Sequence, residues 1–228
     1  MYQKNKIRKG CKDIWNAYMT ENALYTKNDI PLCPTSAKEI PVGLIAYSEI
    51  KQAPQTECFV HFYIDDYKFD GKRGIWNKPD TALEKLKKYA GVITPDFSTY
   101  QDMPEPIKIY NTFRSRAFGY WLTTQGIAVI NNVRWGTPET YRYCFDGIPK
   151  NSIVAIGTVA SGLNNNVNKR VFEDGLFEMV KRLEPHTIII YGSAKLKCLD
   201  NLRDRGIKII SFPSKTALAF ERIKNEQK

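Results

Sequence analysis

The sequence predicts an α/β fold in which six to seven mostly parallel strands alternate with helices in a barrel-like or strongly curved sheet. Short runs of β-branched residues alternate with longer segments of helical periodicity along most of the chain. Glycines follow several helical segments, as expected where a helix ends in left-handed backbone. Polar residues end nearly every strand, so the strand ends are expected to surround one basin.

The first 43 residues show no such alternation. Cys11 to Leu24 can form a short helix, and three prolines between residues 29 and 41 indicate an extended strap. We therefore expect residues 1–43 to form a helix and a strap packed on a single α/β domain, residues 44–228.

The expected first strand, residues 44–50, is followed by seven residues before the next strand begins at Cys58. Seven residues are too few for a helical crossover, so these two strands are expected to pair antiparallel or to lie apart. Later strands are expected to begin near residues 92, 127, 152, 187 and 207, with helices near 79–90, 104–125, 138–145, 171–183 and 196–205 and a terminal helix capped by Ser214.

The chain has a formal net charge of +10. Such an excess attracts nucleic acid, a nucleotide or an acidic partner, although a basic soluble surface without such a partner has the same composition. Cations on the expected helix faces can together form a belt that follows phosphates. They are Lys85, Lys87, Lys88, Lys181, Arg182, Lys195, Lys197, Arg203 and Arg205.

Several kinds of site are not expected. Five scattered cysteines without a C-x-x-C pair, with only two histidines, indicate neither a disulfide framework nor zinc. The Walker pattern of P-loop nucleotide sites and the G-x-G-x-x-G pattern of NAD sites are both missing from the sequence. With no signal-peptide core and no apolar window long enough for a membrane span, a cytoplasmic protein is expected.

Carboxylates follow two of the expected strands. Asp66 ends the strand that begins at Cys58, Asp70 lies four residues on, and Asp96 follows the next strand. Because parallel strands end at the same edge of a sheet, these acids are candidates for catalysis, with Asp66 and Asp96 as ligands of Mg²⁺ or Mn²⁺. Alternatively, they cap the following turns or pair with arginines.

The long helix expected at residues 104–125 places Arg114 at the edge of its apolar stripe, with Asn111 one turn earlier. An arginine at the border of the core needs a carboxylate or a phosphate, so Arg114 either pairs with Asp96 or Asp66 or contacts a ligand. Arg116 points about 200° away around the helix and cannot share that role.

A polar and aromatic cluster follows the next strand. The cluster suits a base or sugar by stacking, amide hydrogen bonds and phosphate contact, or else forms a rigid turn in which Trp135 covers the barrel mouth. Its residues are Asn131, Asn132, Arg134 and Trp135. Ser161 lies in a polar loop before a helix, a setting suited to anions.

Motifs in order along the chain carry a family resemblance. At FYIDDYKFDG, GVITPDFS, NVRWG and CFDGIPKNSIVAIGT the sequence resembles a domain-of-unknown-function family with an FDG motif, found in phages, plasmids and chromosomes of Gram-positive bacteria. FDG occurs twice here, at residues 69–71 and 145–147. The resemblance implies a mobile-element setting and no particular activity.

The leading hypothesis is a protein that binds or acts on nucleic acid or nucleotides at the carboxyl ends of its strands. If it is an enzyme, a divalent-metal-dependent phosphodiesterase or nuclease-like hydrolase is the expected class. The alternative is a non-enzymatic protein that sequesters a nucleotide or inhibits a host or defence protein. A carbohydrate-active barrel enzyme would use the same acids, but the net positive charge disfavours it.

Overall fold

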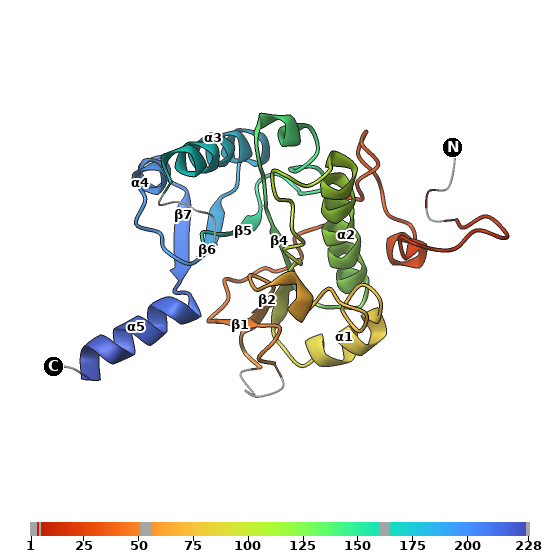
Figure 1. Cartoon of the computed structure of the whole chain (residues 1–228), viewed down its shortest axis with the longest axis horizontal. Coiled ribbons are helices and arrows are strands. Elements are labelled where there is room, and N and C mark those ends of the chain that lie inside the picture. Colours follow the sequence, from red (N-terminus) through yellow and green to blue (C-terminus); the bar gives the residue numbers. More distant parts are fainter. Residues whose placement is uncertain (1–3, 5, 51–55, 160–164, 227–228) are drawn as a thin grey trace.

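The computed structural model describes residue 4 and residues 6–50, 56–159 and 165–226. A seven-stranded, all-parallel sheet in chain order curls into a half-barrel, which confirms the predicted fold class (Figure 1). The strands are β1 (Leu44–Ala46), β2 (Phe59–His61), β3 (Gly91–Ile93), β4 (Val129–Asn132), β5 (Ile153–Gly157), β6 (Thr187–Tyr191) and β7 (Lys208–Phe212). The helices are α1 (Pro79–Leu86), α2 (Glu105–Thr124), α3 (Asn166–Leu183), α4 (Lys197–Asp204) and α5 (Lys215–Glu226), with 3-10 turns η1 (Ala17–Thr20), η2 (Asp66–Lys68) and η3 (Pro138–Arg142).

The prediction that the first two strands pair antiparallel or lie apart was wrong. β1 pairs parallel with β2, from Leu44 opposite Phe59 to Ala46 opposite His61. The first strand ends at Ala46 rather than at residue 50, so residues 47–58 connect the two strands. That length reaches the roughly dozen residues that a parallel crossover needs.

The predicted N-terminal helix is also much shorter than expected. Only η1 is helical between Cys11 and Leu24, because Asn16 and Asn22 adopt left-handed backbone at φ 51° and 61°. The strap that follows reaches the sheet, where the backbone N–H of Ser36 donates to the Val129 carbonyl at 3.0 Å.

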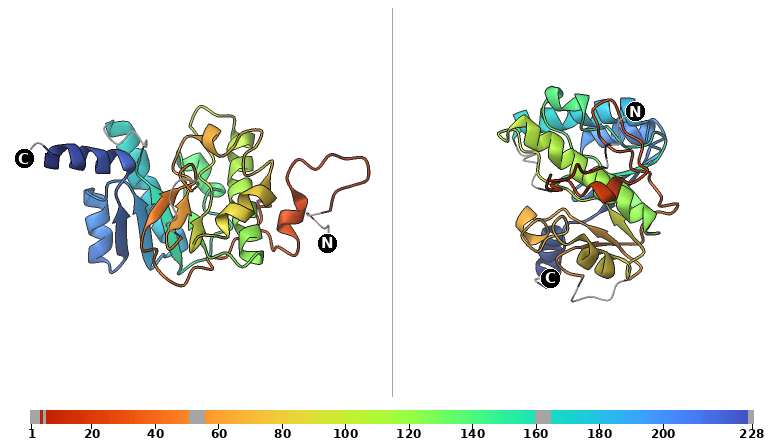
Figure 2. Two further views of the ribbon diagram at one scale, coloured as in Figure 1. Left: turned by 90° about the horizontal axis from the view of Figure 1, so that it is seen from below. Right: turned by 90° about the vertical axis from the view of Figure 1, so that its right-hand side faces the viewer.

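Helices cover the outside of the curl in two groups. α1 and α2 pack on β1–β4, and α3 and α4 pack on β5 and β6, as the separate apolar clusters on that side show. The inside of the curl is filled by side chains from the strands, including Phe59, Ile93, Ile130 and Ile189, together with Ala37 from the strap. α5 extends away from the body of the molecule (Figures 1 and 2).

Aromatic side chains span the inside of the curl near the strand ends. Tyr63, just after β2, stacks on Tyr191 of β6 with ring centroids 5.3 Å apart, and His61 lies 4.1 Å from the same ring. A Cβ on Gly157 would lie 2.8 Å from the Tyr63 ring, so this glycine leaves room for the stack. β2 and β6 therefore meet across the sheet although three strands separate them. None of the described helices is long and apolar enough to cross a membrane.

Gly119 allows α2 to lie close to the sheet and strap, and this generates a test. A Cβ there would lie 2.5 Å from Cγ2 of Thr94 and 2.7 Å from Sγ of Cys33, both fully buried. We expect Gly119→Ala to lower the free energy of unfolding by roughly 1–2 kcal/mol in urea denaturation, although alanine favours helices. The exposed α3 variant Asp174→Ala should change it by less than about 0.5 kcal/mol. Equal stability of both variants would contradict this close packing.

Candidate functional site

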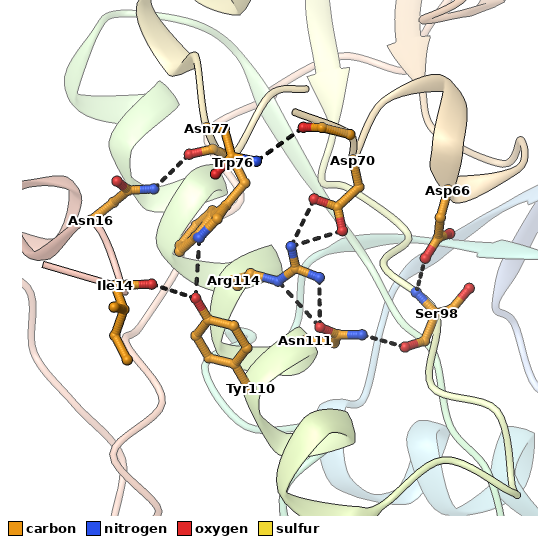
Figure 3. Close-up of polar contacts among 11 residues, drawn as sticks. Ile14, Asn16, Asp66, Asp70, Trp76, Asn77, Ser98, Tyr110, Asn111 and Arg114 are labelled. Atoms are coloured by element: carbon orange, nitrogen blue, oxygen red, sulfur yellow. Dashed lines mark hydrogen bonds and ion pairs between the residues drawn. The ribbon is translucent and has the colours of Figure 1, made fainter. Parts of the chain in front are cut away.

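The predicted residue Arg114 forms an ion pair at the carboxyl ends of the strands. Its Nη1 lies 2.8 Å from each carboxylate oxygen of Asp70, so the partner is neither Asp66 nor Asp96 (Figure 3). Both side chains are largely buried. Burial raises the pKa of Asp70, and the attraction of Arg114 opposes that shift only in part.

A hydrogen-bond chain links this pair to Asp66. Arg114 donates from Nε and Nη2 to Oδ1 of Asn111, at 3.2 and 2.6 Å. Asn111 donates to the Ser98 carbonyl at 2.5 Å, and the Ser98 backbone N–H donates to Oδ2 of Asp66 at 3.1 Å. The loops after β2 and β3 are therefore both fixed to α2 (Figure 3).

Aromatic rings enclose the Arg114 guanidinium. Its Cζ lies 4.0 Å from the centroid of Phe97 and 5.3 Å from that of Tyr110. The Tyr110 hydroxyl accepts from Nε1 of Trp76 at 3.1 Å and donates to the Ile14 carbonyl at 2.6 Å, which attaches the N-terminal segment (Figure 3). Arg114 thus connects the strand-end loops to α2, and Tyr110 beside it holds the segment around Ile14.

A second network contains Asp96 and Arg134. Oδ2 of Asp96 lies 2.7 Å from Nη1 of Arg134, and its Oδ1 accepts from Nδ2 of Asn132 at 2.8 Å. Oδ1 of Asn132 accepts from the Tyr63 hydroxyl at 3.0 Å, which joins this network to the aromatic stack. The charge of Asp96 raises the pKa of Arg134 despite its burial.

The predicted Mg²⁺ or Mn²⁺ site at Asp66 and Asp96 stays a prediction. Among the described residues, no group of three or more His, Cys, Asp or Glu side chains is placed to share one metal ion. Both oxygens of Asp96 already have protein partners, so a metal ion there would have to displace Arg134 or Asn132.

The remaining predicted residues lie apart from these networks. Asn131 donates to the Cys33 carbonyl at 2.9 Å and so holds the strap, on the face of β4 opposite to Asn132. Trp135 packs against α3. The centroid of its ring lies 5.4 Å from that of Phe172, and a Cβ on Gly175 would lie 2.0 Å from Cδ1 of the indole. Ser161 falls outside the described residues.

Sequence reasoning missed the structural role of Arg116, which is 2% exposed. It donates to the carbonyls of Asn132, Cys144 and Asp146 at 3.0–3.2 Å, and burial lowers its pKa to about 10. Arg116, Asn111, Asn132 and Arg134 line a cavity of about 20 Å³. That volume holds about one water and is far too small for a nucleotide.

A larger depression lies at the ends of β1 and β2. It has a volume of about 500 Å³, and none of the described residues that line it is acidic. We call it the basic groove and define it by its cationic and tyrosine side chains. They are Tyr47 after β1, Tyr67, Lys68, Lys72 and Arg73 after β2, and Lys85 on α1.

The first FDG motif builds one wall of the basic groove. Phe69 is buried against Phe62, with ring centroids 5.3 Å apart, and Asp70 is held by Arg114. The backbone then turns tightly, with the Gly74 N–H donating to the Gly71 carbonyl at 2.8 Å. A Cβ on Gly74 would lie 2.3 Å from the Phe69 carbonyl oxygen, so this turn requires glycine. The turn places Lys72 and Arg73 between two glycines, a sequence signal that could have identified the groove.

Together these features define an α/β half-barrel with a cationic groove at the carboxyl ends of its strands. The chain belongs to the family described as Domain of unknown function (DUF4417), whose model matches residues 24–213. It is 36% identical over 186 residues to the Gene 1 protein of Mycobacterium phage L5, covering 80% of this chain and 79% of that protein. It is 35% identical over 193 residues to the Gene 1 protein of Mycobacterium phage D29, covering 83% and 68%. No solved structure matches the chain. The predicted resemblance to a phage-associated family is confirmed.

The Asp70–Arg114 pair can be tested by removing one partner. Asp70→Ala leaves a buried guanidinium without its carboxylate, and we expect the free energy of unfolding to fall by about 3 kcal/mol. Asp65→Ala is a matched control in the same loop, because Asp65 forms only an exposed ion pair with Lys68 at 2.8 Å. Chemical denaturation of both variants measures the difference, and equal losses would show that Asp70 has no special role.

Burial of His61 predicts a pH dependence. Burial lowers its pKa to about 3, whereas the unfolded chain has a histidine pKa of about 6.5. Because the unfolded state binds the proton first, stability should fall as the pH drops below about 6.5 and keep falling towards pH 3. From pH 7 to pH 4.5 the natural sequence should lose roughly 2–3 kcal/mol more than His61→Phe. His186→Gln, at an exposed site, should follow the natural sequence; parallel profiles for the natural protein and His61→Phe would refute the assignment.

Proposed function

We propose that this protein binds nucleic acid through the basic groove, as a binding protein rather than a hydrolase. The observation that carries the proposal is the gathering of four cations around a volume of about 500 Å³ whose described lining includes no acid. Its walls come from the segments that follow the carboxyl ends of β1 and β2, where ligands bind in many parallel α/β folds, and from Lys85 in the last turn of α1.

The cations of the groove are available to phosphates. In the described part of the chain, no carboxylate forms an ion pair with Lys72, Arg73 or Lys85. Lys68 forms an ion pair with Asp65 on the surface. Because exposed ion pairs contribute little to stability, a phosphate can replace Asp65 as the partner of Lys68. Binding by these residues would release counterions from the nucleic acid, which favours association at low salt.

The groove is also held in shape before any ligand arrives. The Asp70–Arg114 pair and the tight turn at Gly74 fix the wall that carries Lys72 and Arg73. A preformed wall loses little conformational entropy on binding, so more of the electrostatic attraction appears as affinity.

We propose binding in preference to hydrolysis because the candidate acids already have partners within the protein. Asp70 and Asp96 each face an arginine at 2.7–2.8 Å, and Asp66 accepts a backbone hydrogen bond. To bind a metal ion, Asp70, Asp96 and Oδ2 of Asp66 would each have to give up the protein partner that they already have. The phage relatives are both called Gene 1 protein, a name that assigns no activity.

Charge reversal in the groove tests the proposal. We expect Lys72→Glu with Arg73→Glu to weaken binding of a labelled oligonucleotide at least tenfold. The slope of log affinity against log salt should become shallower by about two, because each of the two cations is expected to neutralise about one phosphate. The measurement is fluorescence anisotropy across a salt series.

The matched control reverses two exposed cations at the ends of α4, by Lys197→Glu with Arg205→Glu. This pair changes the net charge equally but lies at the other end of the sheet (Figure 1). The proposal fails if both double variants weaken binding to the same extent, or if the natural protein does not bind at low salt. Intact oligonucleotide after incubation with Mn²⁺ would support binding over hydrolysis, and cleavage that the Asp96→Asn variant loses would favour the metal-dependent alternative.

A further inference from the structure

We infer that the basic groove takes a single strand of nucleic acid and that one base of the strand stacks on Tyr67. This inference rests on the proposed function and deepens it by naming the class of ligand. It follows from the size of the groove, the exposure of Tyr67 and the way in which the tyrosine is held.

The volume of the groove limits what can enter it. About 500 Å³ lies within the range of pockets that enclose small ligands, so a nucleotide or a short stretch of an extended strand fits inside. In a duplex the bases are stacked within the helix, and only its phosphates could reach the groove. A single strand can place both phosphates and a base there.

Tyr67 offers an aromatic surface at the edge of this volume. Tyr67 is 76% exposed, so most of the residue is accessible to a ligand. The Lys68 ammonium lies 5.5 Å from the ring centroid, so the ring already lies beside a positive charge. Aromatic rings beside cations are the combination with which proteins bind single strands without regard to sequence.

The position of Tyr67 is fixed although its ring is exposed. It lies within η2, where the Lys68 N–H donates to the Asp65 carbonyl at 3.0 Å and the Phe69 N–H to the Asp66 carbonyl at 2.9 Å. Asp66 is in turn held by the Ser98 N–H, and Phe69 is buried on the C-terminal side. The backbone of Tyr67 is therefore anchored on both sides, which favours a preformed stacking surface over a mobile loop.

Tyr47 forms a fixed wall on the β1 side of the groove rather than a second free platform. Its ring is stacked on Phe62 at 5.1 Å with planes 25° apart, and the Lys85 ammonium lies 6.0 Å from its centroid. Lys72 and Arg73 line the same volume as Tyr67. If a base stacks on Tyr67, these two cations can contact the phosphates on either side of that base.

The experiment compares ligands on the full-length protein. Labelled single-stranded DNA and RNA of one length and sequence, the corresponding DNA duplex, and AMP as a competitor are titrated by fluorescence anisotropy at low salt. The variants are Tyr67→Ala, Tyr67→Phe and the charge reversal of Lys72 and Arg73. Phe220→Ala, an aromatic ring 68% exposed on α5, is the matched control.

We expect Tyr67→Ala to weaken single-strand binding about 5- to 150-fold, the effect of removing one stacked base, and to leave duplex binding unchanged. Tyr67→Phe, which keeps the ring, and Phe220→Ala should bind like the natural protein. The DNA and RNA arms show which backbone is preferred, and either preference supports the inference.

The experiment separates failure of this inference from failure of the proposed function. If charge reversal abolishes binding but Tyr67→Ala binds single strands normally, the inference is wrong and the proposed function stands. Duplex bound as tightly as single strand would also overturn the inference, as would AMP competing as effectively as the oligonucleotide. If the charge reversal has no effect on any ligand, the proposed function itself fails.

Discussion

The ion pair between Asp70 and Arg114 is the interaction on which the arrangement of the strand ends depends. Arg114 comes from the middle of α2, so one guanidinium fixes the FDG loop to the helix that covers β3 and β4. Through Asn111 and Ser98 it also holds the loop after β3. If Arg114 lost its carboxylate, the buried guanidinium would strongly destabilise the fold, so the FDG loop has to place Asp70 accurately. The basic groove exists because Asp70 is directed inward while the following turn is directed outward.

The strand ends are thereby divided into two unlike parts. At β3 and β4, arginines, carboxylates and amides satisfy one another around a cavity large enough for about one water. At β1 and β2, cations surround an open volume without acidic residues in its described lining. The closed part holds the strand-end loops together, and the open part is the surface to which the proposed function is assigned. This division is the reason why we propose that the protein binds nucleic acid rather than cleaving it.

The sequence indicated several of the site residues but not their partners. Asp70, Asp96 and Arg134 were predicted near the strand ends and Arg114 on the long helix, and the structure joins the four as two separate ion pairs. Which acid meets which arginine depends on how α2 crosses the sheet. Asp70 and Arg114 are 44 residues apart along the chain, a separation over which periodicity carries no information. The groove was missed because the cations of the loop after β2 resemble an ordinary solvated surface, and because Tyr47 and Lys85, which complete the groove, lie on other segments.

The sequence by itself determined the alternation of strands and helices, a mostly parallel sheet and the polar character of the strand ends, because these follow from local periodicity and from helical connections long enough for parallel crossovers. Only the tertiary structure decided that β1 pairs parallel with β2, that Trp135 packs on Gly175, and that Lys72 and Arg73 face the same volume as Tyr47. Those outcomes depend on where helices pack and where loops are fixed. They are set by long-range burial and ion pairing, which no window of neighbouring residues contains.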